Sequence, residues 1–252
     1  MKKIISLLAV GALVSSLSAH DLWSSAKNGS VLKADMVYGH HFPQPEAIAK
    51  DRVKLFEPMK VVGDGYEETL TQKGENDYHF EGKGLKKGTY LVLSNYKPTA
   101  WIEKKDGKWE MDKTRKDTSE EVVYCGVSTM SGKMILVVDN DSGEFATKAL
   151  GKGLEFTPMQ KASKIKKDAL VKFRLTNDGK PVKKASVVGS YGGYASNDLA
   201  QAFTATTDLN GEFEFRALKS GLWYLKTTLN TDSGDKNCET INQKASITFD
   251  VK

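Results

Sequence analysis

Histidine is the residue type through which this chain could bind a metal ion. Its four histidines, His20, His40, His41 and His79, all lie in the first third of the sequence. Imidazole nitrogens suit Ni²⁺, Cu²⁺, Co²⁺ and Zn²⁺, and the affinity of such ligands rises toward Cu²⁺. Composition does not choose among these ions. We therefore take the four histidines as candidate metal ligands.

The chemistry of His20 depends on the segment before it. Residues 1–19 contain Lys2, Lys3, a short apolar stretch and small residues at the end, which is the layout of a cleavable secretory signal peptide. The apolar stretch is too short to span a bilayer comfortably. A cut after Ala19 would make His20 the first residue of a soluble, periplasmic protein.

An N-terminal histidine offers two nitrogens to one ion. Its α-amine and its ring Nδ1 close a six-membered chelate around a metal. The α-amine has a reference pKa of about 7.7 to 8.0, so it loses its proton to a metal more easily than a lysine does. Signal peptidase tolerates many residues at this position, which leaves open that His20 has no role. Asp21 adds a neighbouring carboxylate.

The other histidines lie on or beside expected strands. Adjacent side chains of a strand point to opposite faces, so His40 and His41 cannot both reach one ion unless the chain bends at Gly39 or Pro43. We expect one ligand and one neighbour there, or a polar cap at the strand end. His79 alternates with two aromatic residues, and a half-buried structural histidine is as good an interpretation as a ligand.

Short alternating runs separated by Gly, Asn, Asp and Lys predict antiparallel strands and an all-β fold. Glu46–Lys50 and Thr118–Tyr124 are the best candidates for short helices. Turn signals occupy residues 104–108 and 176–180. The clearest strands in the first half are Val31–Tyr38, Tyr78–Glu81, Thr89–Ser94 and Lys133–Val138.

Two β-sandwich domains follow from the chain length and from a change in pattern. A glycine pair, Pro158 and a lysine-rich run precede a fresh set of strands in the second half. We predict an N-terminal β domain at residues 20–155, which carries the candidate metal site. A C-terminal β-sandwich of immunoglobulin or transthyretin type is predicted at residues 156–252.

The net charge and the absence of catalytic motifs argue against some classes of function, and the cysteines indicate the compartment. The formal net charge of +5, or +3 without Lys2 and Lys3, is spread through the chain and does not indicate nucleic-acid binding. Cys125 and Cys238 are most simply one disulfide in an oxidising compartment, although sequence does not establish their pairing. No GxSxG, HExxH or phosphate-loop motif occurs. We therefore expect a binding protein and not an enzyme.

Several motifs resemble those of the nickel uptake transporter family, periplasmic proteins first catalogued as a domain of unknown function. The most distinctive pieces are AHDLW (19–23) and VYGH (37–40). The resemblance implies a periplasmic protein that captures Ni²⁺ for a nickel or cobalt importer of the inner or outer membrane, with His20 and His40 as ligands. His41 and His79 are not covered by the pattern. The remaining matching pieces are GTYLV (88–92), NDGKPV (177–182), TDLNGEF (207–213) and SGLW (220–223).

Two other functions use the same residues differently. His20 with a second histidine would form a copper histidine brace, as in oxidative polysaccharide-cleaving enzymes, which also have β-sandwich folds. Alternatively, the chain is a metal-free interaction module of the cell envelope. Copper-dependent turnover would favour the first alternative, and absence of stoichiometric metal the second.

Overall fold

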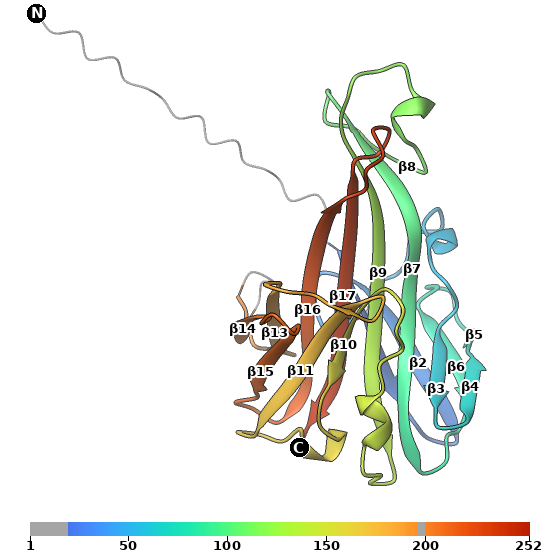
Figure 1. The fold of residues 1–252 in the computed structure, drawn as a ribbon. Helices are drawn as coiled ribbons and strands as arrows, with labels where there is room; N and C mark the ends of the chain where they lie inside the picture. The colour runs from blue at the N-terminus through green and yellow to red at the C-terminus, as the bar shows by residue number, and fades with distance from the viewer. Residues whose placement is uncertain (1–19, 196–199) are drawn as a thin grey trace, which may run out of the picture.

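The computed structural model describes residues 20–195 and 200–252 (Figure 1). The prediction of an all-β fold is confirmed, because these residues form strands, loops and four single turns of 3₁₀ helix, with no α-helix among them. No helix in the described ranges is long and apolar enough to cross a membrane. The predicted signal peptide lies outside the described residues.

The strands form three sheets. The first has the order β1-β2-β6-β5, and its strands are β1 (Asp21–Lys27), β2 (Val31–Gly39), β6 (His79–Lys83) and β5 (Thr71–Gln72). The second has the order β10-β11-β12 with β15 paired to β11, and its strands are β10 (Leu154–Pro158), β11 (Leu170–Asn177), β12 (Lys180–Pro181) and β15 (Glu212–Arg216).

The third sheet is the largest and has nine strands. Its order is β14-β13-β16-β17-β9-β7-β3-β4, with β8 paired to β7. Figure 1 shows the four long strands β7, β9, β16 and β17 running side by side along the molecule. The strands are β3 (Lys60–Gly63), β4 (Tyr66–Thr69), β7 (Gly88–Lys104), β8 (Trp109–Met111), β9 (Val122–Val138), β13 (Ser186–Tyr191), β14 (Phe203–Thr206), β16 (Gly221–Asp232) and β17 (Thr240–Val251).

This nine-stranded sheet lies between two hydrophobic cores. On β7, Leu91 belongs to the core that contains β10, β11 and β15, whereas Val92 belongs to the core that contains β1, β2 and β6. On β9, Ile135 belongs to the first of these cores and Met134 to the second. Successive side chains of a strand point to opposite faces of the sheet, so neighbouring residues enter different cores. Two sandwiches therefore share one middle sheet, with β9 parallel to β17 at their junction.

Two local predictions were wrong. Neither Glu46–Lys50 nor Thr118–Tyr124 is helical. Val122 to Tyr124 are the first residues of β9 and pair with the end of β7, and hydrogen bonding within the sheet replaces the helical pattern. A 3₁₀ turn, η2 (Arg115–Asp117), lies just before this region.

The two cysteines form a disulfide that links neighbouring strands of the middle sheet. Cys125 of β9 bonds to Cys238, which lies just before β17. Both side chains are buried against Ile102 of β7. The bond joins positions 113 residues apart, and it holds together the two strands that pair in parallel.

Strand β1 is held on the middle sheet by side-chain hydroxyls. Ser246 and Thr248 of β17 donate to the carbonyl oxygens of Leu22 and Ser24. Gly132 of β9 lies directly beneath, where a Cβ atom would come within 2.9 Å of the Trp23 backbone. These contacts fix the position of the strand that follows His20.

The Gly132→Ala variant is expected to lower the free energy of unfolding by about 1–3 kcal/mol, because its methyl group overpacks a contact made with backbone atoms. Urea denaturation of the mature protein measures the change. Gly29→Ala is the matched control, since its Cβ would meet only one atom, at the ordinary distance of 3.6 Å. Equal stability of the two variants would contradict the close approach of β1.

Candidate metal centre

The pairing of β1 with β2 brings His20 and His40 together. Asp21 pairs with Gly39 across the two antiparallel strands, so the preceding residue on one strand lies opposite the following residue on the other. The ring centroids of His20 and His40 are 4.2 Å apart. The His20 ring also stacks on Tyr38, with centroids 4.6 Å apart and planes 14° from parallel.

Glu46 completes a cluster of three possible ligands. One ligand atom from each of His20, His40 and Glu46 lies within 4.8 Å of the others, and all three residues are partly exposed. The backbone N–H of His40 donates to Glu46 Oε1 at 3.0 Å. A Cβ atom at Gly39 would lie 2.3 Å from the same oxygen, so the glycine leaves space for the carboxylate.

Sequence reasoning missed Glu46. The residue lies six positions after His40, beyond Pro43 and Pro45, in a segment predicted as a short helix. The chain instead returns to the end of β2, with a turn in which Gln44 N–H donates to the His41 carbonyl. The only sequence feature that could have indicated this ligand was a carboxylate just beyond two prolines. That feature does not predict where the carboxylate points.

The structure does not bring the other two histidines into the cluster. His41 lies beside His40, with ring centroids 6.2 Å apart, and lines a neighbouring pocket to which His40 also contributes. His79 pairs across β6 and β2 with Asp35, whose carboxylate lies 2.6 Å from its Nδ1. Asp35 precedes Gly39 by four residues, roughly 13 Å along an extended strand. Of the four predicted histidine ligands, His20 and His40 therefore lie in the cluster, whereas His41 and His79 lie outside it.

Asp21 has a different role from the one expected. Its carboxylate lies 2.5 Å from Lys226 Nζ and 3.5 Å from Lys244 Nζ, because alternate residues of β1 point to opposite faces. Lys244 also donates to the His20 carbonyl oxygen at 2.9 Å. These ion pairs anchor the start of β1 to β16 and β17, and they hold the His20 backbone in place.

The surroundings of His20 favour its neutral, metal-binding form. Burial lowers the pKa of His20 below its ordinary value, and repulsion by His40, Arg52 and Lys244 adds to this effect while Glu46 opposes it. A neutral imidazole has a free lone pair for a metal ion. No proton then has to leave the ring at neutral pH before it binds.

The cluster offers a mixed nitrogen and oxygen donor set. Two imidazoles and one carboxylate are present in the folded chain, and cleavage before His20 would add the α-amine. This combination suits divalent ions such as Ni²⁺, Cu²⁺, Co²⁺ and Zn²⁺. All three side chains are partly exposed, so a further ligand from solvent can reach the site.

Comparison with known proteins gives a family but no function. A family model described as a domain of unknown function, DUF4198, matches residues 17–231. No curated protein matches the chain. Two similar solved structures are the D0-D1 domain of intimin, with 13% identity, a TM-score of 0.22 and coverage of 91% of this chain and 97% of that one, and the fibronectin(III)-like modules of Clostridium thermocellum CbhA, with 10% identity, a TM-score of 0.19 and coverage of 91% and 94%.

Proposed function

The chain belongs to the DUF4198 family, a domain of unknown function, and we propose that it is a periplasmic protein that binds a transition-metal ion, Ni²⁺ first, for an uptake system. The observation that carries this proposal is the convergence of His20, His40 and Glu46 at one end of the β1–β2 pair. Strand pairing and the hydrogen bond from His40 N–H to Glu46 Oε1 bring these groups together. Two imidazoles and a carboxylate placed this close can bind one divalent cation.

Processing of the chain belongs to the proposed mechanism. A cut after Ala19 frees the α-amine of His20, which then chelates the ion together with the ring. His40 supplies a second imidazole, and Glu46 supplies a negative charge that offsets part of the charge of the ion. The same cut that releases the exported protein would therefore complete its metal site.

The choice of Ni²⁺ comes from the resemblance of AHDLW (19–23) and VYGH (37–40) to the nickel uptake transporter family. The donor set itself also accepts Cu²⁺, Co²⁺ and Zn²⁺. A nickel or cobalt importer is the proposed partner, and capture and release of the ion is the proposed activity. The disulfide between Cys125 and Cys238 is compatible with an oxidising compartment.

Isothermal titration calorimetry with NiCl₂ tests the site. We expect mature protein, purified after export, to bind one Ni²⁺, and a variant with one alanine inserted before His20 to bind about 100-fold more weakly, a loss of about 2.7 kcal/mol. The inserted residue moves the free amine away from the ring and so destroys the chelate. Equal affinities would remove the N-terminal chelate from the proposal.

Substitutions separate the ligands from the other histidine. His40→Ala and Glu46→Gln are expected to weaken Ni²⁺ binding by about tenfold or more, since each removes a donor or a charge. His79→Ala is the control and should bind as the unsubstituted protein does. A reductant-dependent peroxide assay on the copper-loaded protein distinguishes binding from the histidine-brace alternative, for which turnover is required.

A further inference from the structure

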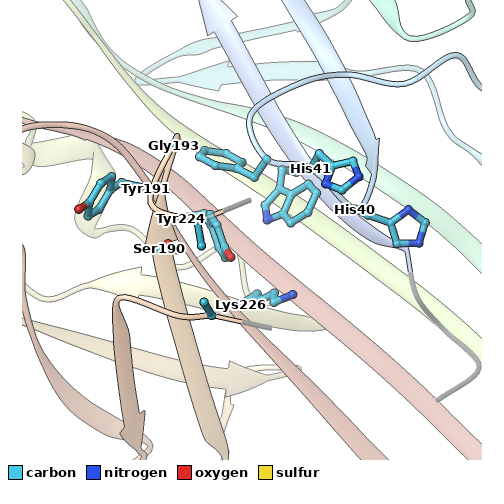
Figure 2. A pocket seen from close by; sticks show the side chains of 11 residues that line it. His40, His41, Ser190, Tyr191, Gly193, Tyr224 and Lys226 are labelled. Carbon is cyan, nitrogen blue, oxygen red and sulfur yellow. The ribbon is translucent and has the colours of Figure 1, made fainter. Parts of the chain in front are cut away.

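A pocket adjoins the metal cluster and shares His40 with it. Figure 2 shows His40, His41, Tyr224 and Lys226 around this pocket. The ring of Trp23 and the side chain of Phe42 also line it. Strands β1 and β16 and the segment after β2 therefore form a second binding space directly beside the proposed ion.

The charges around the two spaces suit an anion. Lys226 lines the pocket, and its ammonium is paired with the Asp21 carboxylate, which also lies 3.5 Å from Lys244 Nζ. Repulsion by Arg52 also acts on the His20 ring. The Lys226 ammonium therefore places a positive charge in the pocket, next to His40 of the metal cluster. A negatively charged ligand bound with the ion would be attracted both to this ammonium and to the ion.

The pocket also has hydrogen-bonding groups for such a ligand. Trp23 is 1% exposed, and its indole Nε1 is buried with no hydrogen-bond partner in the part of the chain that the structure describes. A buried donor without an acceptor destabilises the protein, and an acceptor from a ligand would relieve that cost. The His41 imidazole faces the same space. A carboxylate supplies acceptors for both groups and an opposite charge for Lys226.

We propose that the protein takes its metal ion as a complex with a small chelator that bears carboxylates. The ion lies at His20, His40 and Glu46, while a chelator carboxylate occupies the pocket beside Trp23, His41 and Lys226. This inference rests on the proposed function, because it adds a second ligand to the same ion. The chelator would supply further oxygen ligands to the ion beside those of the partly exposed cluster.

Nickel citrate is the probe for this inference. Calorimetry on the mature protein compares NiCl₂ in a non-coordinating buffer, preformed nickel citrate and citrate alone. We expect nickel citrate to bind at least tenfold more tightly than NiCl₂, and radiolabelled citrate to co-elute with the protein only when nickel is present. Citrate that strips nickel from the protein would overturn the inference and leave the proposed function standing. Failure of both nickel forms to bind would overturn the two together.

Two variants locate the chelator. His41→Ala is expected to bind nickel citrate about tenfold more weakly and NiCl₂ within about twofold of the unsubstituted protein, because His41 lies outside the metal cluster. Lys226→Gln keeps a hydrogen-bond donor toward Asp21 and should reduce the affinity ratio of nickel citrate to NiCl₂. Variants that lower both affinities in parallel, or neither, would place the chelator elsewhere and overturn the inference.

Discussion

Replacement of Cys125 and Cys238 by alanine is expected to lower the free energy of unfolding by about 4–5 kcal/mol. The disulfide joins positions 113 residues apart, and a cross-link of that span removes a large amount of conformational entropy from the unfolded chain. It also ties β9 to the start of β17, where the two strands pair in parallel. Urea denaturation of the mature double variant measures the loss.

The loss of packing at the two alanines must be separated from the loss of the cross-link. Reduced, unsubstituted protein supplies this control, since it keeps both sulfur atoms in the buried cluster with Ile102. We expect the reduced protein to lose most of the same stability. A change below about 1 kcal/mol on reduction would show that the cross-link contributes little.

Lys133→Met is expected to destabilise the protein by about 3–5 kcal/mol, because it leaves the Glu155 carboxylate buried without its ion partner. The two side chains are 6% and 5% exposed, and Lys133 Nζ lies 2.7 Å from Glu155 Oε2. The same ammonium donates to the Phe156 carbonyl oxygen. Burial lowers the pKa of Lys133, and the adjacent carboxylate opposes that shift.

A double-mutant cycle tests whether the cost comes from the unpaired charge. Glu155 also accepts a hydrogen bond from the backbone N–H of Leu150 through Oε2 and one from the backbone N–H of Gly151 through Oε1, and Gln at this position keeps an acceptor oxygen for one of the two. The Lys133→Met, Glu155→Gln double variant should therefore be more stable than Lys133→Met alone. Additive losses, measured by urea denaturation, would contradict a coupled ion pair.

The strands of the second half could be predicted closely because their side chains alternate. The pattern predicts a fresh set of strands there, and β11, β15 and β17 are among the strands that form. A two-residue period in the sequence predicts which side chains share a face of a strand, whatever the partner strand is. The period does not predict which strands pair with each other.

The alternation of side chains could not predict the shared middle sheet. Strands from both predicted regions, 20–155 and 156–252, pair within it, and β9 lies parallel to β17. A strand buried on both faces loses its alternation, as the run Lys133–Val138 illustrates with six consecutive largely apolar residues. Which apolar residue faces which core is decided when the two outer sheets pack.

The sequence by itself determined the all-β class and most strand positions, since these follow from local periodicity, and residue chemistry made His20 and His40 candidate ligands. Only the tertiary structure decided that Glu46 joins these two histidines and that His79 pairs with Asp35. The reason is physical: a ligand set depends on which side chains the strand register and the turn after β2 place within a few ångströms, and those contacts are non-local.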